Sequence, residues 1–111
     1  MDASVLVWWL GRDNPVVLSL YIDGAKASAT QLNSITRWVL ELTGSSTLTI
    51  DSATASGGTF VLDANNAKLE INLSDVTGLT AGRYWARLIS YDPAHDDGIV
   101  WFDQRIAELR A

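Results

Sequence analysis

The side chains best suited to chemistry are gathered in one short segment, Asp92-Pro93-Ala94-His95-Asp96-Asp97-Gly98. Carboxylate oxygens are ligands for hard divalent cations, so three aspartates beside an imidazole could bind a metal ion. The spacing lacks the Asp-x-Asp-x-Asp-Gly…Glu order of a calcium loop. Asp-Pro begins turns and Asp-Gly ends them, so a solvated loop between two strands explains the same residues. We therefore assign no metal ligands, and cation binding by the 92–97 loop stays open.

The single histidine, His95, is the candidate general base. A catalytic histidine needs a positioned nucleophile and a carboxylate that orients the ring. Ser90 is close in sequence, but it lies in a strand-like run without the pattern of a nucleophile elbow. No Gly-rich phosphate loop, zinc motif or cysteine accompanies these residues. We therefore expect a protein that is not an enzyme and that holds no cofactor.

Composition excludes several other classes of function. The 111 residues, 48% hydrophobic and 19% charged, suit one globular domain spanning residues 1–111. A net charge of −5 without a basic stripe argues against nucleic-acid binding. The absence of cysteine excludes disulfide frameworks and the disulfide-bonded immunoglobulin domain of vertebrates. No run is long enough to span a membrane, and residues 4–10 are too short for a signal peptide.

The chain must position any site on strands, because apolar and polar residues alternate along most of it. Turn residues separate these runs every 8–12 residues, which is typical of an all-β sandwich with seven or eight strands. Residues 25–34 are small and polar and are expected to form a loop or a weak edge strand, and residues 63–66 a turn in which asparagine supplies positive φ. The predicted strands are 4–10, 16–22, 35–42, 47–51, 59–62, 68–73, 83–91 and 99–109. The predicted core contains Leu18, Leu20, Trp38, Leu40, Leu69, Ile71, Tyr84 and Leu88.

The segment before strand 83–91 carries the clearest fold signal. Leu79 is followed by Gly82, and Tyr84 enters the alternating run two residues later. In a tyrosine corner the ring lies under the preceding loop and its hydroxyl bonds to the backbone upstream, which is typical of an immunoglobulin-like antiparallel sandwich. Trp38, on the third strand, occupies the place of the central aromatic in such a sandwich. We assign structural roles to Trp38, Gly82 and Tyr84.

A candidate interaction surface is formed by Trp85, Arg87, Trp101 and Asp103. If Tyr84 points inward, alternation directs Trp85 and Arg87 outward, and a hairpin would place Trp101 and Asp103 beside them. Exposed aromatics next to arginine are typical of protein interfaces. In the alternative interpretation, one tryptophan lies in the core and the other is covered by the N-terminal strand.

The C-terminal half resembles the end of small immunoglobulin-like domains encoded by tailed bacteriophages and prophages. The resemblance rests on the run Leu79-x-x-Gly82-Arg83-Tyr84-Trp85-Ala86-Arg87-Leu88-Ile89-x-Tyr91-Asp92 and on Gly98-Ile99-Val100-Trp101. Tyr21-Ile22-Asp23-Gly24 and the Trp38-centred strand are similar too. Such domains occur in baseplate, tail-fibre and other virion-associated proteins. The resemblance implies a structural or interaction role and carries no catalytic residues to this chain.

These observations lead to two functional hypotheses. In the first, the chain is a phage or prophage module, in the virion or the host bacterial cytoplasm, that binds a virion protein or a second copy of itself. Exposed sandwich strands and the Trp85/Trp101 face would make the contact. In the second, the chain is a carbohydrate-binding module of a phage or bacterial surface protein, with outward aromatic rings stacked on sugars.

Overall fold

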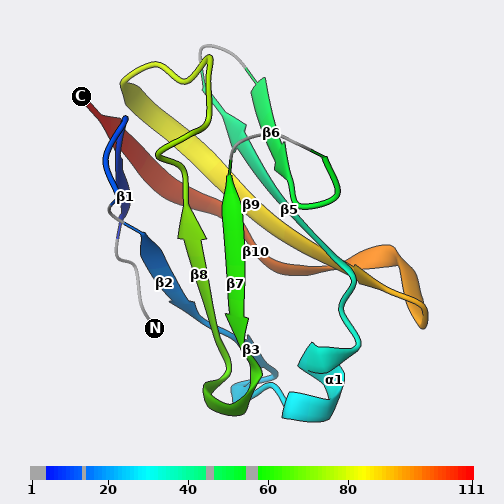
Figure 1. Ribbon diagram of the computed structural model, residues 1–111. Helices are drawn as coiled ribbons and strands as arrows, with labels where there is room; N and C mark the ends of the chain where they lie inside the picture. Colours follow the sequence, from blue (N-terminus) through cyan, green and yellow to red (C-terminus); the bar gives the residue numbers. More distant parts are fainter. Residues whose placement is uncertain (1–4, 14, 45–46, 55–57) are drawn as a thin grey trace.

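The architecture is described by a computed structural model that covers residues 5–13, 15–44, 47–54 and 58–111. Its larger sheet has five strands in the order β1-β10-β9-β5-β6 (Figure 1). The first pair, β1 with β10, is parallel, and the other neighbours are antiparallel. The strands are β1 (Leu6–Trp9), β10 (His95–Arg110), β9 (Gly82–Asp92), β5 (Arg37–Thr43) and β6 (Thr47–Asp51).

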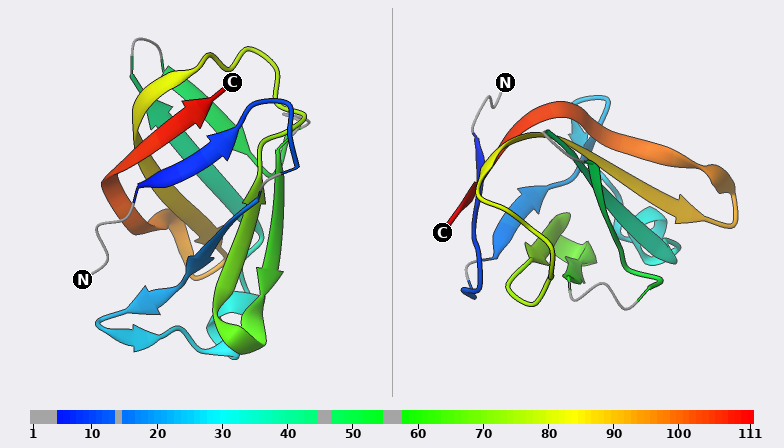
Figure 2. Two further views of the ribbon diagram at one scale, coloured as in Figure 1. Left: turned by 90° about the vertical axis from the view of Figure 1, so that its left-hand side faces the viewer. Right: turned by 90° about the horizontal axis from the view of Figure 1, so that it is seen from above.

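A smaller antiparallel sheet faces the larger one and has the order β2-β8-β7. Its strands are β2 (Val16–Ser19), β8 (Lys68–Asn72) and β7 (Thr59–Asp63). Seen from above, the five-stranded sheet curves over the three-stranded one (Figure 2). The described residues contain four further elements. They are the two strands of a short ribbon, β3 (Tyr21–Ile22) and β4 (Ala25–Lys26), a helix α1 (Ala29–Asn33) and a 3-10 turn η1 (Ala64–Asn66). The predicted all-β class is confirmed.

The core lies between the two sheets, and the alternating pattern explains its membership. All eight predicted core residues are buried. Trp8 joins them from β1 and is 1% exposed, with its indole Nε1 donating to the carbonyl oxygen of Ile71 on β8 at 3.1 Å. This bond links the two sheets and satisfies the one polar group of an otherwise apolar ring.

The segment before β9 is anchored by Tyr84. The ring is 3% exposed, and its hydroxyl donates to the carbonyl oxygen of Thr80 at 2.9 Å. Gly82 opens the strand with φ of 154°, a conformation that residues with a Cβ rarely adopt. The hydrogen bond holds the loop over the edge of the core, so Tyr84 and Gly82 position the start of β9.

Residues 25–34 differ from the predicted loop or weak edge strand. They contain β4 and α1, and the Ser28 side chain caps the helix by accepting from the Gln31 amide at 3.2 Å. Leu32 is fully buried and fixes the helix to the core. The prediction missed the helix because its five residues carry a single apolar anchor and are too few to show a helical period.

Residues 63–66 also differ from the prediction. Residues 64–66 form η1, and the positive φ falls on Ala67, at 52°, rather than on an asparagine. Ala67 is buried, and its carbonyl oxygen accepts from the Leu20 amide at 2.8 Å. Tertiary contacts therefore impose the left-handed conformation on a residue that does not prefer it.

The described residues form ten strands, more than the seven or eight predicted. Run 16–22 divides at Leu20, whose backbone bonds to Ala67 and Ala27 instead of continuing a ladder. The last strand begins at His95 rather than at Ile99, so most of the predicted 92–98 loop belongs to the β9–β10 hairpin. Residues 105–110 complete this strand, as predicted.

Candidate interaction surface

The outer face is the side of the five-stranded sheet that points away from the three-stranded sheet. Trp85 is its main aromatic residue and is 54% exposed. Its neighbours across the ladders are Thr43 on β5 and Ile106 on β10. Arg87 follows two residues later on the same face, as alternation along β9 predicted. The outward placement of Trp85 and Arg87 is therefore confirmed.

Arg87 holds two carboxylates in place beside Trp85. Its Nε donates to Asp103 Oδ1 at 3.1 Å, and its Nη1 lies 3.5 Å from Glu41 Oε1. The hydrogen bond from Arg87 lowers the pKa of the Asp103 carboxyl, and the same contact raises the pKa of Arg87. This triad spans β5, β9 and β10.

A second group of charges lies on the other side of Trp85. Glu108 accepts from Arg83 at 3.0 Å and from Arg110 at 2.8 Å. The hydrogen bonds from Arg110 and then Arg83 lower the pKa of Glu108. The guanidinium of Arg110 also lies over the Trp9 ring, 5.6 Å from its centroid. These contacts place Trp9 at the β1 margin of the outer face.

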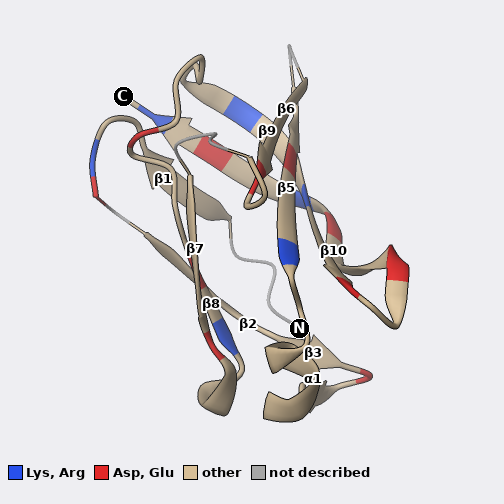
Figure 3. Ribbon diagram, turned by 45° about the vertical axis from the view of Figure 1, so that its right-hand side comes forward, with Lys and Arg blue, Asp and Glu red and all other residues tan. Residues whose placement is uncertain are grey.

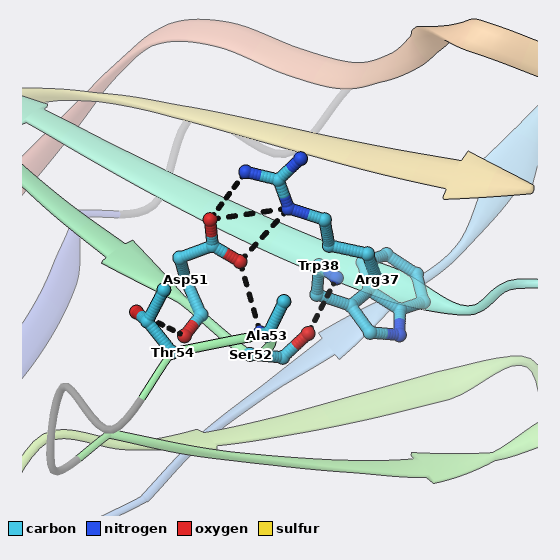
Figure 4. Close-up of polar contacts among 6 residues, drawn as sticks. All are labelled: Arg37, Trp38, Asp51, Ser52, Ala53 and Thr54. Carbon is cyan, nitrogen blue, oxygen red and sulfur yellow. Dashed lines mark hydrogen bonds and ion pairs between the residues drawn. The ribbon is translucent and has the colours of Figure 1, made fainter.

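The third group, Arg37 with Asp51, joins β5 to β6 (Figure 4). Arg37 binds Asp51 through Nε, at 2.9 Å from Oδ1, and through Nη2, and its guanidinium lies 5.0 Å from the Tyr91 ring centroid. Asp51 also accepts from the Ala53 amide at 2.9 Å. The hydrogen bond from Arg37 is the main cause that lowers the pKa of Asp51. Paired on several sides, Arg37 has little freedom to reorient.

Trp85 stands between two hollows of the outer face. One, of about 460 Å³, is lined by Glu41, Thr43, Thr47, Trp85, Ala86, Arg87, Asp103 and Gln104. The other, of about 480 Å³, is lined by Thr43, Gly44, Arg83, Tyr84, Trp85 and Ile106. Trp85 therefore lines two depressions that a partner can fill, and the Arg87–Asp103 pair lines one of them.

Trp101 does not share the outer face with Trp85, Arg87 and Asp103, the other residues of the predicted interaction surface. Its Nε1 donates to the Ser90 hydroxyl at 2.8 Å, and its ring centroid lies 6.0 Å from that of Trp38. Both partners are buried, so Trp101 packs toward the core. The prediction was wrong for this residue because the β9–β10 register shifts between Val100 and Phe102, which leaves Trp101 as the extra residue of a bulge.

A second register shift brings Asp103 back to the outer face. It falls between Phe102 and Arg105, and Gln104 within it has φ of 55°. Asp103 therefore reaches Arg87 as predicted, although the strand between them is irregular. The prediction missed Ile106 and Glu108 as members of the face, because the register shift after Phe102 inverts the alternation that follows it. It also missed Arg83, which the regular alternation of β9 places on the same face as Trp85.

The acidic segment forms the end of the β9–β10 hairpin. Asp92 is buried and lies 2.9 Å from His95 Nδ1. Burial raises the pKa of Asp92, but hydrogen bonds from His95 and the Ala94 amide outweigh it and lower the pKa overall. Within the described ranges, no three His, Asp or Glu side chains come together as a cation site. The hydroxyl of Ser90 is fully buried and accepts from Trp101.

Comparison with protein-family models, curated proteins and solved structures finds no match to this chain. None of the helices in the part of the chain that the structure describes has the length and apolar character to cross a membrane.

Proposed function

We propose that this protein is a non-enzymatic interaction module that binds another protein, or a second copy of itself, through the outer face of its five-stranded sheet. The observation that carries the proposal is Trp85, half exposed between two hollows and bordered by fixed ion pairs. Tryptophan and arginine are the residues most enriched among interface hot spots. A tryptophan side chain has only two torsions and offers a large rigid contact area, so it loses little conformational entropy on binding.

We further propose that the fold is an immunoglobulin-like sandwich. The order β5-β9-β10 in one sheet and β2-β8-β7 in the other corresponds to strands C-F-G and B-E-D of that fold. Tyr84 then lies at the start of the sixth strand of the sandwich, with its hydroxyl bonded to Thr80 upstream, where a tyrosine corner belongs. The parallel pair of β1 with β10 extends the same sheet.

The proposed partner is a virion component of a tailed phage or prophage, and the place of action is the virion or the bacterial cytoplasm in which it assembles. This part rests on the resemblance of the residues between Leu79 and Trp101 to phage immunoglobulin-like domains. Mass spectrometry of particles purified from the encoding strain tests it. The chain is expected in the particles, and its absence from them would contradict the virion role.

Binding of the purified particles to the immobilised chain tests the face. Trp85→Ala is expected to weaken binding at least tenfold, because truncation removes the ring that fills the interface. The matched control is Val61→Ala, since Val61 is 56% exposed on the three-stranded sheet. Equal binding by both variants would show that the outer face makes no contact.

Carbohydrate binding is a second candidate function. It is favoured by the polar side chains that line the hollow between Trp85 and Asp103. The Trp85 ring stands beside the Thr43 and Thr47 side chains and the Arg87–Asp103 pair, which can donate to and accept from sugar hydroxyls. Titration of the tryptophan fluorescence with oligosaccharides tests this alternative. A saturable change that Trp85→Ala abolishes would favour a sugar ligand over a protein.

A further inference from the structure

The ion-paired side chains of the outer face differ in charge from the other charged residues of the chain. Four arginines and four carboxylates on this face are joined in ion pairs: Arg37, Arg83, Arg87 and Arg110 with Glu41, Asp51, Asp103 and Glu108. The chain has 8 Lys and Arg and 13 Asp and Glu, so the other charged residues of the sequence are four basic and nine acidic. The paired side chains therefore carry no net charge together, and the net charge of −5 comes from the other charged residues. Charged positions of both signs are visible along these strands in Figure 3.

This distribution decides how two copies can approach. Two acidic molecules repel each other through most pairs of surfaces, and the repulsion is smallest where each presents a neutral face. Because these arginines and carboxylates are already paired within one chain, they offer no excess charge that would favour an oppositely charged partner. The charge pattern thus fits a second copy better than it fits a strongly basic or acidic protein.

The arrangement on the face also suits a twofold axis. Trp85 and its cross-strand neighbour Ile106 form an apolar centre. The Arg83–Glu108 pair lies on one side of this centre along the strands, and the triad of Arg87 lies on the other. A twofold axis that lies between the two faces at Trp85, perpendicular to the strands, places each charge group over the other group of the second copy. Each group contains both signs. The face is self-complementary in the sense that an isologous dimer requires.

The size of the face is adequate. Strands β9 and β10 span 11 and 16 residues. With about 3.3 Å per residue and about 4.8 Å between strands, the five strands present an area on the order of 700 Å². A standard interface buries about 800 Å² on each partner.

We propose that the outer face binds the outer face of a second copy, in a twofold dimer centred on Trp85 and Ile106. This proposal rests on the proposed function, because it names the partner of the same surface. Association is expected to strengthen when salt is added, since salt screens the repulsion between the two acidic remainders and leaves the apolar centre intact.

Sedimentation equilibrium of the purified chain over a concentration series, at low and high salt, tests the dimer. A dimer that strengthens with salt is expected, and Trp85→Ala should weaken it about 30-fold, the loss typical of a hot-spot tryptophan. Val61→Ala, on the other sheet, should leave it unchanged. A monomer at every concentration and salt would overturn the proposal, whereas particle binding would still test the proposed function separately.

A crosslinking experiment locates the interface independently. The chain has no cysteine, so a Thr43→Cys variant carries one thiol beside Trp85. Packed sheets lie about 10 Å apart, so a bismaleimide of about that length should join two copies of this variant rapidly. Val61→Cys provides the control on the far sheet. Equal rates for the two variants would contradict a contact through the outer face.

Discussion

The two faces of the five-stranded sheet are built from alternate residues of the same strands, yet they hold their side chains in different ways. On the inner face, Trp38, Tyr84 and Leu88 are buried against the other sheet. On the outer face, Trp85 is half exposed, and its neighbours are held by ion pairs. The register of the strand, and not the type of residue, therefore decides whether an aromatic side chain of this sheet lies in the core or on the candidate interaction surface.

The largest expected effect is the loss of an inner aromatic. Trp38→Ala should lower the free energy of unfolding by about 3–5 kcal/mol, because Trp38 is 6% exposed and its ring packs against Trp101. Urea denaturation followed by circular dichroism measures this loss. A variant of nearly wild-type stability would contradict the contrast between the two faces.

A smaller effect is expected from the hydrogen bond between Trp101 and Ser90. Trp101→Phe should cost about 1–2 kcal/mol of unfolding free energy, because it leaves the buried Ser90 hydroxyl without its indole donor. Adding Ser90→Ala to this variant should recover part of the loss. A double-mutant cycle by urea denaturation measures the coupling, and strictly additive effects would show that the two side chains do not interact.

Acid should lower the stability of the fold by protonating the carboxylates that form ion pairs on the outer face. The pKa values of Asp51, Asp103 and Glu108 are lowered in the folded chain, so their pairing stabilises it fully above their unfolded pKa values, near 4. This contribution is lost as the pH falls through the lower folded values. Thermal melting between pH 6 and pH 2 should therefore show a falling melting temperature. Asp51→Asn should reduce the slope, and an unchanged slope would show that the Asp51 pair adds no stability.

The smallest effect on stability is expected at Trp85. Trp85→Ala should change the free energy of unfolding by less than about 1 kcal/mol, because half of the ring is already in water. Thermal melting of the variant provides the measurement. A loss comparable to that of Trp38→Ala would show that Trp85 is a structural residue and would remove the basis for an outer contact surface.

The amino-acid sequence determined the all-β class, eight residues of the core and the outward direction of Trp85 and Arg87. These features follow from alternation, which a strand enforces locally because successive side chains point to opposite faces. The sequence did not predict the helix α1 or the residue of positive φ in the turn after β7. The positive φ of Ala67 and the five-residue α1 are maintained by contacts with distant residues, and such contacts leave no local pattern.

Only the tertiary structure decided the membership of the outer face. The place of Trp101 depends on a bulge in β10, and a bulge forms where the packing of two sheets favours an extra residue. Arg83 meets Glu108, and Arg87 meets Glu41, because β5, β9 and β10 are neighbours, although these residues lie far apart in the chain. The sequence therefore specified which residues face outward over regular stretches, and long-range pairing decided which of them share a surface.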